Sequence, residues 1–327
     1  MYNTQLLLRW SKTLLSAGAL LLAAAQAASA AGYPERPIKV IVPWAAGGDT
    51  DIIYRVFAPL LQKQLGQPVV IANVKGASGT VGERQAAGAD PDGYTLFAPH
   101  DYVLSVYLAG LTDIDYSKAF EPICLVASTP SVVTSAGKKP WGDSFKNMVA
   151  YAKEHPGAIK VGASLGSTSQ YSMALMAKAA GIKVGYVPYD GTAPRMNALL
   201  GGHIDLADSN LTQKGKVDAG LLKFLAVMTE KRLPELPNIP TMKELGYDVQ
   251  YAVNRGFAVP KGTPANVKAK FENACAAAAK EPSFAEAMKQ QGTQVHYLGA
   301  KDYAAFMEKD AKITKDLTKD LGLLKRQ

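Results

Sequence analysis

The sequence predicts an α/β fold, because short apolar segments alternate with small-residue turns and amphipathic helices. Residues 38–42 (Ile-Lys-Val-Ile-Val) are expected to form a buried strand. Apolar residues from Ile52 to Leu65 then recur at helical spacing before Gly66, a position suited to a helix C-cap. The same order of strand, turn and helix returns in residues 69–82. Repeated units of this kind predict parallel sheets with ligands at the carboxyl ends of the strands.

The alternation continues through the rest of the chain. Further strands are expected at residues 94–98, 159–163, 183–187, 204–207, 222–228 and 251–260, and helices at 144–155, 171–180, ahead of 201–202 and from 264 onward. The proline-rich residues 234–240 interrupt the pattern as a surface loop. A chain of 327 residues usually forms two hydrophobic cores.

The turn at residues 43–51, between the first strand and the first helix, is a candidate anion site. The first amide groups of a helix have no internal partner, and the helix dipole favours negative charge there. Gly47 and Gly48 allow the backbone to approach a ligand without a Cβ clash. The alternative is an ordinary strand-to-helix turn in which one of residues 49–51 acts only as a cap.

A series of motifs carries a family resemblance. These motifs are Tyr33-Pro34-Glu35-Arg36-Pro37-Ile38, Val42 to Asp51 with Arg55, Gly66 to Val70, Gly76 to Gly82, Pro91 to Leu96, Val187 to Gly191 and Leu200 to Asp205. Taken in order, they resemble the substrate-binding proteins of tripartite tricarboxylate transporters, the Bug family. The resemblance covers nearly the whole mature chain and implies a type II periplasmic binding fold, which periodicity alone does not establish.

This resemblance implies two lobes, each with a mostly parallel sheet, joined by a hinge of crossing strands. The first lobe would be discontinuous and comprise residues 31–126 and 252–327, and the second would comprise residues 127–251. The chain would cross between the lobes in residues 123–134 and return in residues 251–260. Closure of the lobes would exclude water and strengthen the contacts to a ligand.

The resemblance also implies capture of a small carboxylated solute, with one carboxylate held by backbone amides, Ser78 and bridging water. The candidate ligand-binding residues of the first lobe are Trp44, Ala45, Gly47, Gly48, Thr50, Gly76, Ala77, Ser78, Thr80 and His100. Those of the second lobe are Ser164, Ser167, Thr168, Tyr189, Thr192 and Asp208. Trp44 could equally belong to the core, and the hydroxyl-rich turns could be simple helix caps.

Three residues depart from the family pattern. Ser78 replaces a common glycine, Asp190 stands where a lysine is frequent, and Arg195 lies in a helix start usually built of small apolar residues. An inward Arg195 could clamp a second carboxylate bidentately. We expect it to face solvent, as most arginines do. The identity of the solute stays open among dicarboxylates, tricarboxylates, acidic amino acids, aromatic acids and nicotinate-like acids.

Cys124 and Cys275 are the only cysteines. Their spacing excludes a CxxC redox or zinc motif. They could form a disulfide in an oxidising compartment, because both lie in segments assigned to or near the first lobe. The alternative of two separate buried thiols is slightly preferred, and the sequence does not reveal the distance between the two side chains.

The N-terminus predicts export. Arg9 and Lys12 precede an apolar run from Leu14 to Ala25, and residues 28–30 (Ala-Ser-Ala) form a signal-peptidase site, so residues 1–30 are expected to be removed before Ala31. The formal net charge is +8, and removal of the two basic residues leaves +6. The basic residues are scattered without interleaved aromatics, which argues against nucleic-acid binding.

The sequence favours a binding protein over an enzyme. The four histidines are dispersed and no HExxH motif occurs, so neither a metal nor a cofactor is expected. Residues 166–169 (Gly-Ser-Thr-Ser) lack the second glycine of a nucleophile elbow, and residues 76–82 lack a Walker lysine. We therefore expect a monomeric periplasmic protein that delivers its solute to the membrane permease subunits of a tripartite tricarboxylate transporter. The alternatives are a ligand-binding partner of a sensory receptor and, less favoured, an exported α/β enzyme.

Overall fold

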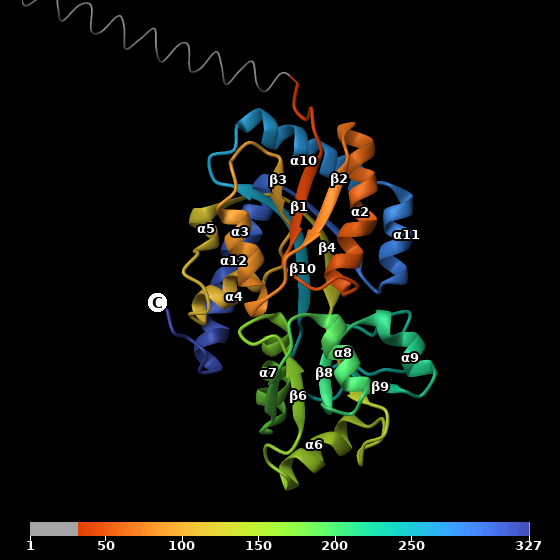
Figure 1. Cartoon of the computed structure of the whole chain (residues 1–327). Coiled ribbons are helices and arrows are strands. Elements are labelled where there is room, and N and C mark those ends of the chain that lie inside the picture. Colours follow the sequence, from red (N-terminus) through yellow and green to blue (C-terminus); the bar gives the residue numbers. More distant parts are fainter. Residues whose placement is uncertain (1–31, 327) are drawn as a thin grey trace, which may run out of the picture.

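The computed structural model describes residues 32–326 as two lobes, each built on one sheet (Figure 1). The strands are β1 (Ile38–Val42), β2 (Val69–Asn73), β3 (Thr95–Phe97), β4 (Phe120–Pro130), β5 (Val132–Ala136), β6 (Lys160–Ala163), β7 (Gly185–Pro188), β8 (Leu206–Ser209), β9 (Leu222–Val227), β10 (Ala252–Pro260) and β11 (Gln294–Gly299). The predicted signal segment 1–30 and the cleavage point before Ala31 lie outside the described residues.

Helices cover both sheets. The helices are α2 (Asp49–Leu65), α3 (Thr80–Ala87), α4 (Tyr102–Leu108), α5 (Tyr116–Ala119), α6 (Phe145–Glu154), α7 (Thr168–Ala180), α8 (Thr192–Leu200), α9 (Lys214–Asp218), α10 (Ala265–Ala279), α11 (Pro282–Gln290) and α12 (Ala300–Asp320), with 3₁₀ turns η1 (Ala77–Gly79) and η2 (Leu211–Gln213). Among the described residues, no helix combines the length and apolarity that a membrane crossing needs.

Each sheet has most of its strands in one direction. The first has the order β11-β4-β10-β3-β1-β2, in which β1 is parallel to β2 and β3, and β10 is antiparallel to both β3 and β4. Strands β1 to β4 therefore point the same way. The second sheet has the order β7-β6-β8-β5-β9, and only β5 opposes the other strands. The predicted two-lobe α/β class is confirmed, and each sheet mixes parallel with antiparallel pairings.

The chain crosses between the sheets at two adjacent points. Strand β4 of the first sheet ends at Pro130 and β5 of the second begins at Val132, with Ser131 between them. Tyr251, just before β10, accepts a hydrogen bond of 3.0 Å from the Ser131 N–H through its carbonyl. Strands β4 and β10 pair antiparallel along their length, so the outgoing and returning segments form the predicted pair of crossing strands (Figure 1).

Several elements differ from the sequence-based prediction, which also lacks the short helices α4, α5 and α9. Helix α7 begins at Thr168 rather than at residue 171, because the small polar residues of its first turn weaken the apolar periodicity. Strand β8 lies two residues later than expected. Strand β11 was not predicted, and its residues are only half-buried or exposed at the edge of the first sheet, so its apolar signal is weak.

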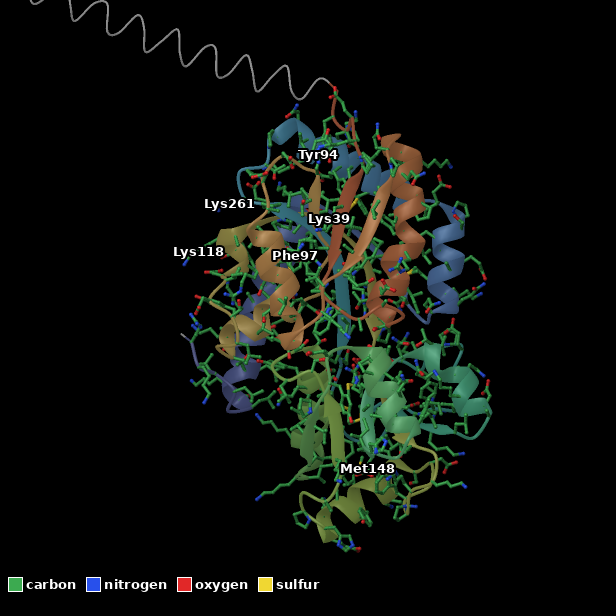
Figure 2. All side chains as sticks on the ribbon, in the orientation of Figure 1. Lys39, Tyr94, Phe97, Lys118, Met148 and Lys261 are labelled. Atoms are coloured by element: carbon green, nitrogen blue, oxygen red, sulfur yellow. A yellow bond between two sulfur atoms is a disulfide. The ribbon has the colours of Figure 1, made fainter. Side chains whose placement is uncertain are left out.

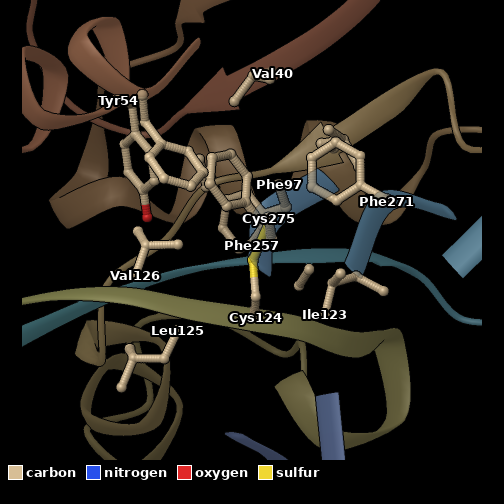
Figure 3. Packing of buried hydrophobic residues seen from close by; sticks show 14 of the residues in the cluster. Val40, Tyr54, Phe97, Ile123, Cys124, Leu125, Val126, Phe257, Phe271 and Cys275 are labelled. Carbon is tan, nitrogen blue, oxygen red and sulfur yellow. A yellow bond between two sulfur atoms is a disulfide. The ribbon is translucent and has the colours of Figure 1, made fainter. Parts of the chain in front are cut away.

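A disulfide joins Cys124 on β4 to Cys275 on α10 in the core of the first lobe (Figure 3). Both residues are fully buried, and Phe257 and Phe271 pack next to them in the same hydrophobic cluster. The slight preference for two separate thiols is therefore wrong. Folding brings together positions 151 residues apart, which spacing alone does not reveal.

The second lobe has its own core, in which Met148 of α6 is fully buried (Figure 2). Helix α6 begins as predicted, because the Ser144 hydroxyl accepts a hydrogen bond of 3.2 Å from the Asn147 N–H. Lys118 and Lys261 lie on the surface of the first lobe (Figure 2). Two separate cores leave a polar seam between the lobes, and the candidate site lies in this seam.

Candidate functional site

A cavity of about 30 Å³ lies between the lobes. Its lining residues are Trp44, Gly48, Asp49, Thr50, His100, Ser164, Ser167, Thr168, Ser169, Gly191, Thr192, Arg195, Asp208, Val253 and Arg255. The set combines the ends of β1 and β6 with the first residues of α2, α7 and α8. The lining is mostly polar although nearly all of these side chains are buried, which is the arrangement of a ligand site rather than of a core.

Three helices start at this cavity. The residues just before α2, α7 and α8 are Gly48, Ser167 and Gly191, and none of them caps its helix with a side-chain hydrogen bond. The first-turn N–H groups of each helix therefore lack a capping side chain at their own N-cap position. Because the positive ends of three helix dipoles meet there, the cavity favours a negatively charged group.

The turn before α2 keeps its shape through Asp51. The Gly47 N–H donates a hydrogen bond of 2.9 Å to the Asp51 carboxylate, which also accepts hydrogen bonds from Asn73 Nδ2 at 2.8 Å and from Arg55 Nε. Gly47 has a φ of 75°, a conformation that favours glycine. Asp51 thus ties the turn to the end of β2 and leaves Gly48 and Asp49 facing the cavity.

Asp49 and Arg255 form a buried ion pair at the cavity. Arg255 Nη2 lies 2.5 Å from Asp49 Oδ2, and the Arg255 side chain is 1% exposed. Arg255 also donates to the hydroxyls of Thr50 at 3.0 Å and Thr129 at 2.7 Å. Burial by itself would raise the pKa of Asp49, but the charge of Arg255 and the hydroxyl of Thr192 hold that pKa below its ordinary value. This pair is therefore ionised and internally satisfied.

The Asp49 carboxylate also connects the two lobes. The Thr192 hydroxyl, at the start of α8, donates to Asp49 Oδ1 at 2.5 Å, and Asn210 Nδ2 donates to Oδ2 at 3.2 Å. Asp49 belongs to the first lobe, whereas both donors belong to the second. The carboxylate therefore stabilises the arrangement in which the lobes meet.

Arg195 and Asp208 are a second pair of opposite charges at the cavity, and each keeps a polar atom without a hydrogen bond to the described residues. Arg195 is 4% exposed and lines the cavity, so the expected solvent-facing orientation is wrong. Its Nη2 donates to the Asp208 backbone carbonyl at 3.2 Å and more weakly to the Thr192 hydroxyl at 3.4 Å. Arg195 Nε and Asp208 Oδ1 are buried and have no hydrogen-bond partner among the described residues. Burial raises the pKa of Asp208 to about 6, against the opposing charge of Arg195.

Aromatic residues form one wall. Trp44 stacks on His100 with ring centroids 5.0 Å apart, and Tyr102 packs edge-on against both rings. His100 Nδ1 accepts a hydrogen bond of 3.2 Å from the Tyr102 N–H, which places the proton of the neutral ring on Nε2. Burial lowers the pKa of His100 despite the neighbouring Asp101. Trp44 Nε1 is a further buried donor without a partner in the described part of the chain.

The structure brings nine of the sixteen candidate residues together at the cavity. They are Trp44, Gly48, Thr50, His100, Ser164, Ser167, Thr168, Thr192 and Asp208. Outside its lining lie Ala45, Gly47, Gly76, Ala77, Ser78, Thr80 and Tyr189. The Tyr189 carbonyl nevertheless orients the site, because it accepts a hydrogen bond of 2.6 Å from the Ser164 hydroxyl.

The second predicted anion turn, at residues 76–80, holds a carboxylate of the protein itself. The Ser78 N–H donates a hydrogen bond of 2.9 Å to Asp190 Oδ1 from the second lobe. The geometry of the turn is therefore suited to an anion, as the sequence suggested, and a side chain fills that place here.

Sequence reasoning did not select six of the lining residues as ligand contacts: Asp49, Ser169, Gly191, Arg195, Val253 and Arg255. The sequence presents Asp49 as a helix cap or as one of several carboxylates that could act as a general acid or base. Arg255 carried a signal that could have been used, because a charged residue inside an otherwise apolar strand is rarely buried without a partner. Among the described residues, no group of three or more His, Cys, Asp or Glu side chains is arranged to hold a metal ion.

Two α/β lobes, crossing strands and a polar cavity at the ends of the strands define the class of two-lobe periplasmic binding proteins. The family model "Tripartite tricarboxylate transporter family receptor" (TctC) matches residues 53–323. The chain belongs to this family of periplasmic solute-binding proteins.

Individual relatives agree with this assignment. Protein BugT of Bordetella pertussis is 34% identical over 272 residues, which are 81% of this chain and 82% of BugT. The solved structure of the periplasmic binding protein BugD has a TM-score of 0.84 at 33% identity and covers 90% of this chain and 100% of its own. A structure of Rhodopseudomonas palustris Rpa4515 with adipate has a TM-score of 0.84 at 28% identity and covers 89% of this chain and 99% of its own.

Proposed function

We propose that this protein captures a small carboxylated solute between its lobes and delivers it to the membrane subunits of a tripartite tricarboxylate transporter. The observation that carries the proposal is the meeting of three helix N-termini, none capped by its N-cap side chain, with Arg195 at one cavity. Helix N-termini and guanidinium groups both bind carboxylates. The adipate in the Rpa4515 structure supports the same ligand class.

The nine candidate residues at the cavity, together with Arg195, are the proposed ligand contacts. A cavity of about 30 Å³ has room for little more than water, which needs about 10–15 Å³. The solute would therefore enter while the lobes are apart, and closure around it would create the surface that the permease recognises. In this proposal residues 31–126 and 252–327 move as one lobe and residues 127–251 as the other.

The proposal also covers the setting of the protein. We expect export with cleavage before Ala31, a monomer in the periplasm, and no catalytic role. An enzyme would convert its ligand, whereas a receptor returns it unchanged. Affinity for the isolated permease, with and without solute, distinguishes delivery to the transporter from docking on a sensory receptor.

The direct test is mass spectrometry of the small molecule released from protein that was purified without denaturant and then unfolded. A carboxylic acid that rebinds to fresh protein and is recovered unchanged supports the proposal. Saturation at about 100 times its Kd should stabilise the native state by about 2.7 kcal/mol in a thermal unfolding assay. A released and rebinding solute without a carboxyl group would overturn the assigned ligand class.

A further inference from the structure

Arg195 and Asp208 place two opposite charges at one cavity without pairing their charged groups to each other. The hydrogen bonds of Arg195 go to the backbone carbonyl of Asp208 and to Thr192, and Arg195 Nε has no partner in the described residues. Asp208 Oδ1 has no hydrogen bond within the described part of the chain, although the hydroxyls of Ser131 and Ser172 face the Asp208 carboxylate. A buried donor or acceptor without a partner is costly, and the cost is larger for charged groups. The two atoms therefore indicate groups that a ligand supplies.

From these two side chains we propose a subsite for adjacent carboxylate and ammonium groups, so that the solute is an α-amino acid. The proposal rests on the function proposed above and narrows it. The carboxylate of the solute accepts from Arg195 Nε, and its ammonium group donates to Asp208 Oδ1. An α-amino acid carries both groups on one carbon atom, which matches two opposite charges on one wall of a small cavity.

The charge balance of the cavity favours a zwitterion over a dianion. The lining contains Arg195, Arg255, Asp49 and Asp208, and the Asp49–Arg255 pair is already satisfied. One positive and one negative side chain remain. A dicarboxylate would leave Asp208 facing a negative ligand with little water to screen the repulsion. A zwitterion neutralises both remaining side chains.

A hydroxyl group is the main competitor for the ammonium group. It could also donate to Asp208, as in a 2-hydroxy acid. Either donor forms a hydrogen bond to the ionised carboxylate, but only the ammonium group also brings a positive charge that attracts Asp208 in a poorly screened site, so the amino acid should bind more tightly than the hydroxy acid of the same skeleton. The plain acid offers no donor and should bind most weakly, because it leaves the Asp208 acceptor unpartnered in a closed site.

The test compares matched acids on the intact mature protein. A thermal-shift assay first screens the twenty common L-amino acids with their 2-hydroxy and deaminated analogues. Calorimetry at pH 7.5 then compares the affinity for L-aspartate with those for L-malate and succinate, and the affinity for L-alanine with those for L-lactate and propionate. We expect an amino acid to be the tightest binder of its set by at least about tenfold. Asp208→Asn should remove that preference by weakening the amino acid and leaving the plain acid unchanged or tighter. Asp218→Asn, on an exposed helix, is the charge-matched control.

The outcomes separate this inference from the proposed function. If plain or hydroxy acids bind as tightly as their amino analogues in the native protein, the subsite assignment is overturned and carboxylate capture stands. If Asp208→Asn is folded by circular dichroism and keeps the full preference for the amino acid, the role of Asp208 is overturned. If the variant does not fold, the comparison of analogues on the native protein still shows whether the site prefers an amino acid. If no acid in the panel binds, the result counts against the amino-acid subsite. The chemical identity of the released solute then tests whether the protein captures carboxylates.

Discussion

The backbone N–H of Ser78 donates a hydrogen bond of 2.9 Å to the carboxylate of Asp190, and this bond joins the first lobe to the second. Ser78 has a φ of 56°, so the turn presents its amide outward in a left-handed conformation. The contact exists only where the lobes meet. Asp190 and Asp49 therefore act as two intramolecular carboxylates that stabilise the closed arrangement.

Asp190→Asn should shift the free protein toward more open forms. A hydrogen bond to a charged group contributes about 1.5–3 kcal/mol, so its weakening should change the ratio of open to closed molecules by up to about tenfold. Small-angle X-ray scattering of ligand-free protein should show a larger mean radius of gyration. Asp90→Asn, at an exposed position of the first lobe, should leave it unchanged. An identical radius in both variants would mean that Asp190 does not stabilise closure.

Asp49→Ala should destabilise the protein by about 3–5 kcal/mol, because it leaves the buried Arg255 charge unpaired. Removal of both charges in Asp49→Ala with Arg255→Met should cost less than the sum of the single changes. Urea unfolding of the four proteins measures this coupling. Asp218→Ala, in an exposed pair with Lys214, should cost no more than about 0.5 kcal/mol. If the changes in unfolding free energy at positions 49 and 255 are additive, the two side chains do not interact as an ion pair.

Gly48→Asp should abolish most binding while leaving the fold intact. Gly48 has a φ of −79°, which any residue adopts, and a Cβ there would lie 3.9 Å from the Thr192 backbone nitrogen without a clash. The new carboxylate would occupy the anion position at the start of α8 and repel the solute. We expect affinity to fall at least about tenfold, or ~1.4 kcal/mol. Gly48→Ala is the size control, and a folded Gly48→Asp protein with native affinity would exclude this position from the site.

Glu83→Gln should raise stability at neutral pH and flatten its pH dependence. Glu83 is fully buried, and burial raises its pKa from 4.5 to about 8 despite the nearby Thr112 hydroxyl. Between these values the unfolded state loses the proton while the folded state keeps it, so stability falls as pH rises, by about 1.4 kcal/mol per unit for this group. Chemical denaturation at pH 5, 6, 7 and 8 should show this slope in the native protein and a smaller one in Glu83→Gln. Parallel curves would refute a buried protonated Glu83.

The binding of an α-amino acid should weaken as the pH falls through about 6. Burial raises the pKa of Asp208. Its carboxylate faces Arg195 from α8, Asp49 from α2 and the hydroxyls of Ser131 and Ser172. Protonation removes the charge that the ammonium group needs, so affinity should be constant above pH 7 and fall toward tenfold per pH unit below 6. Asp49 stays ionised in this range because its pKa is lowered. Calorimetry from pH 8 to 5 measures the profile, which should be flat in Asp208→Asn.

The fold class and the first strand-to-helix turn could be read from local features of the sequence. Apolar periodicity predicts strands and helices residue by residue, and Gly47, Gly48 and Gly66 occupy positions where the backbone must turn. These properties depend on neighbours within a few residues. They identified β1, α2 and most later elements, and also placed His100 and Ser167 at the ends of strands and starts of helices that reach the cavity.

The partners of the charged residues were decided by tertiary structure alone. Arg255 meets Asp49 across 206 residues of chain, because β10 returns beside the start of α2 when the second lobe is complete. Cys124 meets Cys275 for the same reason, since α10 packs on β4. Arg195 points inward because the helix that carries it begins at the seam between the lobes. The sequence by itself determined which segments form strands, turns and helices, while the packing of distant segments determined which charges face each other.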